Sequence, residues 1–117
     1  MGLDWIVEHS SDINYTGPKY HRAKGLSWIL ESYGFEESAA MCYGVENKPG
    51  QVPHMNTDQI NKVLKDCKTM ISQQNFSNDI LEAIDKDELM EHLYEAKQLL
   101  EGVLEKDSDN IFIICDY

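Results

Sequence analysis

Residues 85–115 read DKDELMEHLYEAKQLLEGVLEKDSDNIFIIC, in which a helical pattern is followed at once by a strand pattern. Asp85 and Glu88 have the spacing of a capping pair, and the apolar residues after them recur every three or four positions. This spacing predicts a helix over 86–106. Residues 107–110 form a turn cluster, and the β-branched run 111–115 predicts a buried strand. The predicted core-facing residues of the helix are Leu89, Leu93, Ala96, Leu100, Val103 and Leu104.

Two further long helices are predicted upstream. Residues 18–33 place their apolar side chains on one side at helical spacing, and Gly34 is the expected left-handed C-cap. Asn56 and Gln59 have the spacing of a capping box before a second apolar stripe, which predicts a helix over 57–74. The shorter predicted elements are a strand over 2–8, a helix over 36–42, a loop over 43–55 and a helix from Ser77 to Ile84.

The predicted fold class is α+β, with three main helices packed on a small sheet formed by the N- and C-terminal strands. A lone pair of strands is marginal in water, so the helices must cover it. With 117 residues and 42% apolar composition, the chain fits one compact domain over 1–117. No apolar run approaches the ~18 residues of a membrane span, and no secretory leader is visible, so we expect a soluble, cytoplasmic protein.

Most of the negative charge lies in the last third of the chain. The formal net charge is −11, and residues 76–117 contain twelve Asp or Glu against three Lys. Such a chain repels phosphate backbones and anionic lipid, which disfavours direct binding to nucleic acid or to a membrane surface. A basic protein is the favoured partner.

On the predicted 86–106 helix, acidic residues fall on the arc opposite the apolar stripe. Like charges four residues apart repel each other by a few tenths of a kcal/mol, so a neutral face would be more stable. Two interpretations stay open: a docking face for a basic partner protein, or a solvated face that keeps the protein soluble. The candidate partner-binding residues are Glu88, Glu91, Glu95, Glu101 and Glu105.

Cationic and aromatic residues cluster around the predicted start of the 18–33 helix. Free N–H groups and a partial positive charge at a helix start attract anions, so this cluster is a candidate site for a small anionic ligand or for a small enzyme. Alternatively, the cations pair with the acidic residues of the same chain, or a loop covers the tryptophan. The candidate ligand-binding residues are Tyr20, His21, Arg22, Lys24 and Trp28.

No metal or cofactor is expected. Glu88 with His92, and Glu91 with Glu95, are each four residues apart and could reach one ion from a single helix. A di-metal carboxylate site also needs Glu-x-x-His on a facing helix, which the other predicted helices lack. His92 is more simply an ion-pair partner for glutamates on its own helix.

The cysteines give no catalytic or disulfide pattern. Cys42 could form a nucleophilic dyad with His54 or His21, but no surrounding motif supports one. Three cysteines that are far apart and never spaced as C-x-x-C argue against a disulfide framework. We expect buried, reduced thiols at Cys42, Cys67 and Cys115.

The opening Met1-Gly2-Leu3-Asp4-Trp5 resembles the start of small uncharacterised proteins of bacteria, phages and large DNA viruses that begin Met-Gly-Leu-Asp followed by Met or Trp. Tyr20, Arg22 and the 111–117 segment resemble the Tyr-x-Arg helix and the final aromatic strand of some of these proteins. About a dozen positions match, and Trp28 stands in a different register. The resemblance implies a small α+β protein, of viral or phage origin, and supplies no activity.

The leading hypothesis from the sequence is a non-enzymatic accessory or interaction protein whose acidic helix engages a basic partner. The first alternative is a small-ligand or enzymatic role for the cationic and aromatic cluster. The second is a structural role in a homo-oligomer or larger assembly, through Trp5, Trp28 or a sheet edge.

Overall fold

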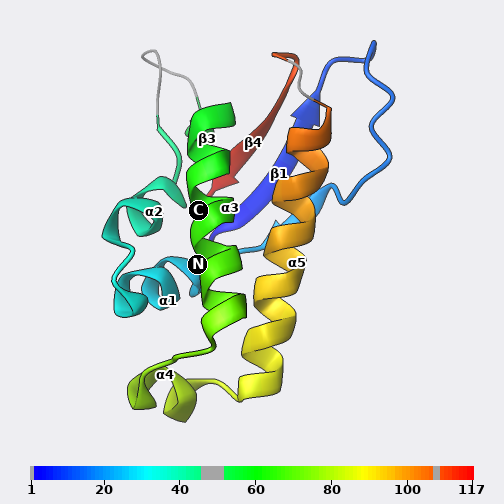
Figure 1. Ribbon diagram of the computed structural model, residues 1–117. Coiled ribbons are helices and arrows are strands. Elements are labelled where there is room, and N and C mark those ends of the chain that lie inside the picture. Colours follow the sequence, from blue (N-terminus) through cyan, green and yellow to red (C-terminus); the bar gives the residue numbers. More distant parts are fainter. Residues whose placement is uncertain (1, 46–51, 107–108) are drawn as a thin grey trace.

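The structure is a computed structural model that describes residues 2–45, 52–106 and 109–117. These residues form an α+β fold with one antiparallel four-stranded sheet in the order β2-β1-β4-β3 (Figure 1). Residues 46–51 of the predicted loop and 107–108 of the predicted turn lie outside the described residues. The elements are β1 (Asp4–His9), β2 (Tyr20–Arg22), α1 (Leu26–Tyr33), α2 (Glu36–Met41), β3 (His54–Met55), α3 (Thr57–Gln73), α4 (Asn78–Ala83), α5 (Lys86–Glu105) and β4 (Ile111–Asp116).

The first and last strands form the centre of the sheet. β1 and β4 pair antiparallel over their full length, from Asp4 opposite Asp116 to His9 opposite Ile111. The α+β class and the pairing of these two segments are therefore confirmed. The prediction that they alone make the sheet is wrong, because β2 adds to the outer edge of β1 and β3 to the outer edge of β4.

The predicted helix over 18–33 is wrong in its first half. Residues 20–22 form strand β2, and the helix begins only at Leu26, after Gly25 has turned the chain through a left-handed conformation with φ of 84°. In β2 His21 is buried between the exposed Tyr20 and Arg22, which is a period of two. The open edge of β1 explains this outcome, because pairing with residues 20–22 satisfies N–H and C=O groups of β1 that would otherwise lack backbone partners.

The second departure is β3, which lies in the region predicted as a loop. Met55 is fully buried and pairs with Ile113 of β4, and Val45 forms an isolated bridge with His54. Two residues are too short to give a periodic signal. The burial of Met55 against β4 is therefore a tertiary effect.

The other predicted helices are confirmed within two residues. Asn56 and Gln59 form the predicted capping box at the start of α3. At the start of α5 the Asp85 carboxylate accepts a hydrogen bond from the Asp87 N–H at 3.1 Å, and no reciprocal bond from Glu88 completes a capping box. The buried residues of α5 match the predicted stripe, except that Leu99 is also buried and Leu104 is only half-buried.

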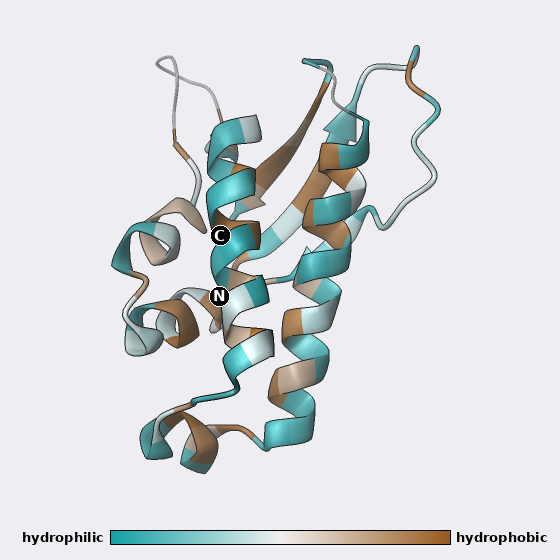
Figure 2. Cartoon of the chain, viewed as in Figure 1, coloured by the Kyte–Doolittle hydropathy of each residue, from teal (hydrophilic) through white to brown (hydrophobic). Residues whose placement is uncertain are grey.

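The helices pack on one side of the sheet. In Figure 1 the two long helices, α3 and α5, lie side by side in front of β1 and β4, while α1 and α2 lie beside α3 on the side away from α5. Figure 2 shows that the visible surfaces of both long helices are mainly hydrophilic. Ser38 of α2 donates a buried hydrogen bond to the Asp66 carboxylate of α3, and Lys62 Nζ lies 3.8 Å from that carboxylate. This polar contact fixes α2 against α3.

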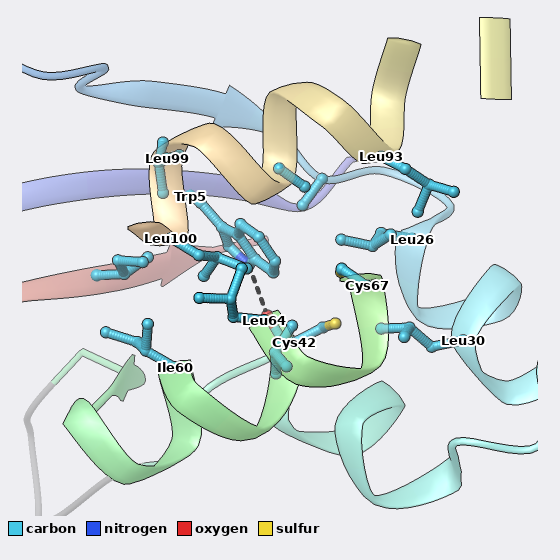
Figure 3. Close-up of a cluster of buried hydrophobic side chains, with 14 of the residues drawn as sticks. Trp5, Leu26, Leu30, Cys42, Ile60, Leu64, Cys67, Leu93, Leu99 and Leu100 are labelled. Atoms are coloured by element: carbon cyan, nitrogen blue, oxygen red, sulfur yellow. Dashed lines mark hydrogen bonds between the residues drawn. The ribbon is translucent and has the colours of Figure 1, made fainter. Parts of the chain in front are cut away.

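Trp5 lies in the middle of the core between the sheet and the helices. Its side chain is fully buried, and the indole N–H donates to the carbonyl oxygen of Cys42 at 3.0 Å. Figure 3 shows the ring surrounded by aliphatic side chains from α1, α3 and α5. A buried indole needs such an acceptor, since an unpaired N–H inside a protein costs about 1–3 kcal/mol. The labelled neighbours are Leu26, Leu30, Ile60, Leu64, Cys67, Leu93, Leu99 and Leu100.

Replacing Trp5 with Phe should lower the free energy of unfolding by about 2–4 kcal/mol, because it leaves a cavity and removes the donor to the Cys42 carbonyl. Trp28→Phe is the matched control, since Trp28 is 42% exposed. It should change stability by less than about 0.5 kcal/mol. Urea denaturation followed by circular dichroism measures both. Equal effects of the two substitutions would contradict the central role of Trp5.

Candidate functional site

Carboxylates line the solvent side of α5. Glu88, Glu91, Glu95 and Glu105 are all exposed. Within the described residues, Glu88, Glu91 and Glu105 form no ion pair, and Glu95 approaches only His21. We call these four residues the acidic face of α5. Their charge is available to another molecule.

Glu101 is the exception among the acidic residues predicted to bind a partner. Its carboxylate lies 3.0 Å from Lys97 Nζ on the same helix and 3.5 Å from Lys68 Nζ on α3. The hydrogen bond from Lys97 is the main reason that the pKa of Glu101 is lowered, and the Lys68 charge acts in the same direction. Glu101 therefore links α3 to α5 and adds less negative charge to the surface.

Three of the five predicted ligand-binding residues come together, although not at a helix start. Tyr20, His21 and Arg22 line a hollow of about 280 Å³ between β2 and α5, together with Glu95 and Gln98 of α5. Gln98 had no sequence signal, because only the β2–α5 contact brings it to this place. The hollow thus combines a guanidinium, a hydroxyl, an amide and a carboxylate.

Two side chains at the rim of this hollow, Tyr20 and Arg22, already have a partner within the chain. The Tyr20 hydroxyl donates to the Asp4 carboxylate at 2.9 Å. Arg22 Nε lies 3.8 Å from the same carboxylate. A ligand anion would have to compete with Asp4 for these donors.

Under the hollow, His21 stacks on His92 of α5 with ring centroids 4.9 Å apart. His21 is 4% exposed, and the buried Nε2 atoms of both rings have no hydrogen-bond partner among the described residues. Burial, with a smaller contribution from His92, lowers the pKa of His21 to about 4. The Glu95 carboxylate lies 3.8 Å from His21 Nδ1, but it is 58% exposed and therefore screened, so burial dominates. Burial also lowers the pKa of His92.

Lys24 and Trp28 do not join this group. Lys24 lines a separate hollow of about 240 Å³ at the start of α1, with Ser27 and Tyr43 among its other lining residues. Trp28 projects from α1 and is partly exposed. The prediction that all five residues share one helix N-terminus is wrong, because β2 and Gly25 separate Tyr20, His21 and Arg22 from the start of α1.

The three cysteines are buried and unpaired by disulfides, as predicted. Burial raises the pKa of Cys67 and of Cys115 to about 12, and it raises the pKa of Cys42 further. A nucleophilic thiolate is therefore strongly disfavoured at these positions. Among the described residues, no group of three or more His, Cys, Asp or Glu side chains could hold a metal ion.

Comparison with protein families, curated proteins and solved structures finds no match to this chain. The resemblance of the opening residues to small bacterial, phage and viral proteins therefore stays a prediction. Within the described residues, no helix is both long and apolar enough to cross a membrane.

Acidification should destabilise the protein between about pH 6.5 and pH 4. The unfolded chain binds a proton at His21 near pH 6.5, whereas the folded chain resists it until about pH 4. Stability is therefore complete above pH 6.5 and decreases as the pH falls, by roughly 3 kcal/mol from His21 alone. Urea unfolding at a series of pH values measures this decrease.

His21→Phe keeps a ring against His92 and removes the titration. Its free energy of unfolding should fall less than that of the wild type over the same pH interval. Trp28→Phe is the control, because it changes a partly exposed aromatic ring on α1 without removing a titratable group, and it should leave the difference between pH 7 and pH 4.5 unchanged. An unaltered pH dependence in His21→Phe would show that His21 does not cause the loss of stability on acidification.

Proposed function

We propose that this chain is a non-enzymatic interaction protein and that the acidic face of α5 binds a basic partner protein. The observation that carries the proposal is the exposure of Glu88, Glu91 and Glu105 without an ion-pair partner among the described residues. Neighbouring carboxylates on one helix repel each other, and cations of a partner would relieve that repulsion. The same field would steer a basic protein toward α5 before contact.

The packing of α5 supports a rigid rather than an adaptable docking surface. Its opposite side is buried through six residues of the core, and Lys68 bridges it to α3 through Glu101. The helix backbone that carries the exposed carboxylates is therefore held in place along about 26 Å between Glu88 and Glu105, given a rise of about 1.5 Å per residue. A fixed row of charges favours a partner with a matching row of Lys or Arg.

The alternatives have weaker support. An anionic ligand in the hollow between β2 and α5 would meet the Glu95 carboxylate and would compete with Asp4 for Arg22. Self-association would bring together two chains that each carry a net charge of −11. A basic partner faces neither cost.

The double substitution Glu88→Lys/Glu91→Lys should weaken binding of a basic partner by at least about tenfold, because it replaces attraction with repulsion over the N-terminal half of the acidic face. Binding of a fluorescent oligolysine peptide, measured by anisotropy at low salt, provides a defined readout. Affinity capture from a cell extract then identifies the natural partner.

Glu31→Lys/Glu36→Lys is the matched control, since these exposed residues of α1 and α2 give the same change in net charge. The control should reduce peptide binding much less than the α5 substitutions. If both double variants lose affinity equally, only the net charge matters, and α5 is not the docking face. Circular dichroism establishes that each variant is folded.

A further inference from the structure

Strand β4 is apolar on both sides, although helices cover only one. The inward side chains of Ile111, Ile113 and Cys115 are buried, whereas the outward Phe112 and Ile114 are only half-buried. In an antiparallel sheet with one solvated face, outward positions are usually polar. Figure 2 shows β4 in brown along most of its length. The sequence run IFIIC predicted a fully buried strand, and its outward half lacks that burial.

The outward apolar side chains continue across the sheet. Ile6 of β1 stands opposite Ile114 of β4, and the same row ends in Tyr20 of β2 on one edge and His54 of β3 on the other. We call the side of the sheet that faces away from α3 and α5 the outer sheet face. It is not flat, because a hollow of about 460 Å³ lies at its β3–β4 edge and has Val52, Phe112 and Ile114 in its lining.

Along the strand direction, acidic residues stand on both sides of this apolar row, near the two ends of β1. At one end Asp4 and Asp116 are directly opposite each other in the β1–β4 pair, and like charges in that position destabilise a sheet. Arg22 lies near Asp4, but Asp116 forms no ion pair within the described residues. At the other end Glu8 is exposed beside Phe112 in the register. A molecule that covers the outer sheet face must therefore be apolar in the middle and cationic at both ends.

We propose that the outer sheet face binds an amphipathic helix of a basic partner protein, with an aliphatic stripe over Ile6 and Ile114 and Lys or Arg at each end. The dimensions fit a single helix. The two edge strands lie about 14 Å apart at a strand spacing of about 4.8 Å, which is slightly more than the ~10 Å diameter of a helix. Asp4 and Glu8 are about 14 Å apart along β1, so the cations of the helix would be about nine residues apart.

Two other occupants have less support. Phe112 and Tyr20 could stack on bases of a single-stranded nucleic acid, but the acidic ends of the face and the net charge of −11 repel phosphate. A second copy of this chain would place its own acidic residues against these. This surface is separate from the acidic face of α5, which lies on the opposite side of the sheet, so either proposal can fail alone.

The probe is a synthetic helical peptide with a leucine stripe and lysines about nine residues apart. Titration into the ¹⁵N-labelled protein, followed by NMR, should shift the amide resonances of Ile6, Phe112 and Ile114. Two control peptides have the same length: in one the leucines are distributed around the helix, and in the other glutamates replace the lysines. Neither should shift these resonances.

Ile6→Thr/Ile114→Thr should weaken binding of the probe at least tenfold, because threonine keeps the strand propensity of a β-branched residue and removes apolar surface. Glu8→Lys/Asp116→Lys tests the acidic ends without touching the apolar centre and should weaken binding similarly. Leu81→Thr on α4 is the control, since it removes a comparable exposed apolar side chain away from the sheet and should leave affinity unchanged.

The same titration in the Glu88→Lys/Glu91→Lys background separates the two surfaces, and shifts at the outer sheet face should persist there. Shifts confined to α5 in the wild type would overturn the proposal. So would concentration-dependent sedimentation that Ile6→Thr/Ile114→Thr abolishes, because the occupant would then be a second copy. Shifts of the same resonances by a single-stranded oligonucleotide, with none from the peptide, would also overturn it.

Discussion

The burial of Trp5 is the constraint on which the rest of the arrangement depends. A large indole near the start of β1 must be enclosed on all sides, and its N–H must find an acceptor inside the protein. The Cys42 carbonyl supplies that acceptor and so fixes the end of α2 against the sheet. Aliphatic residues of α1, α3 and α5 close the remaining sides (Figure 3). These requirements place the helices on the same side of the sheet.

This one-sided arrangement gives the molecule two different exposed surfaces. On the helical side, the buried stripe of α5 directs its carboxylates outward. Among them, Glu101 forms ion pairs with one lysine of α3 and one of α5. On the opposite side, the sheet keeps Ile6, Phe112 and Ile114 half-buried between acidic ends. Both surfaces carry exposed carboxylates, but only the outer sheet face combines them with apolar side chains. Under our proposals, that apolar contact distinguishes a specific partner from general attraction to positive charge.

The long helices could be predicted because local signals and tertiary packing agree in them. Asn56 and Gln59 begin α3 with a capping box, and the leucines of α5 repeat with the helical period. β2 and β3 could not be predicted in the same way. They are too short for a period to emerge, and they form because the open edges of β1 and β4 provide backbone partners. In residues 20–22 this pairing outweighed the helical pattern that predicted a helix over 18–33.

The candidate sites likewise depend partly on local sequence and partly on tertiary packing. The amino-acid sequence by itself determined the charge of the molecule, the outward direction of the glutamates on α5, and the apolar run over 111–115, because each depends only on residue type and period. Tertiary structure alone decided that His21 stacks on His92, that Lys68 of α3 also pairs with Glu101, and that only one side of β4 is covered. These outcomes join residues far apart in the chain, and local periodicity contains no information on which distant surfaces will meet.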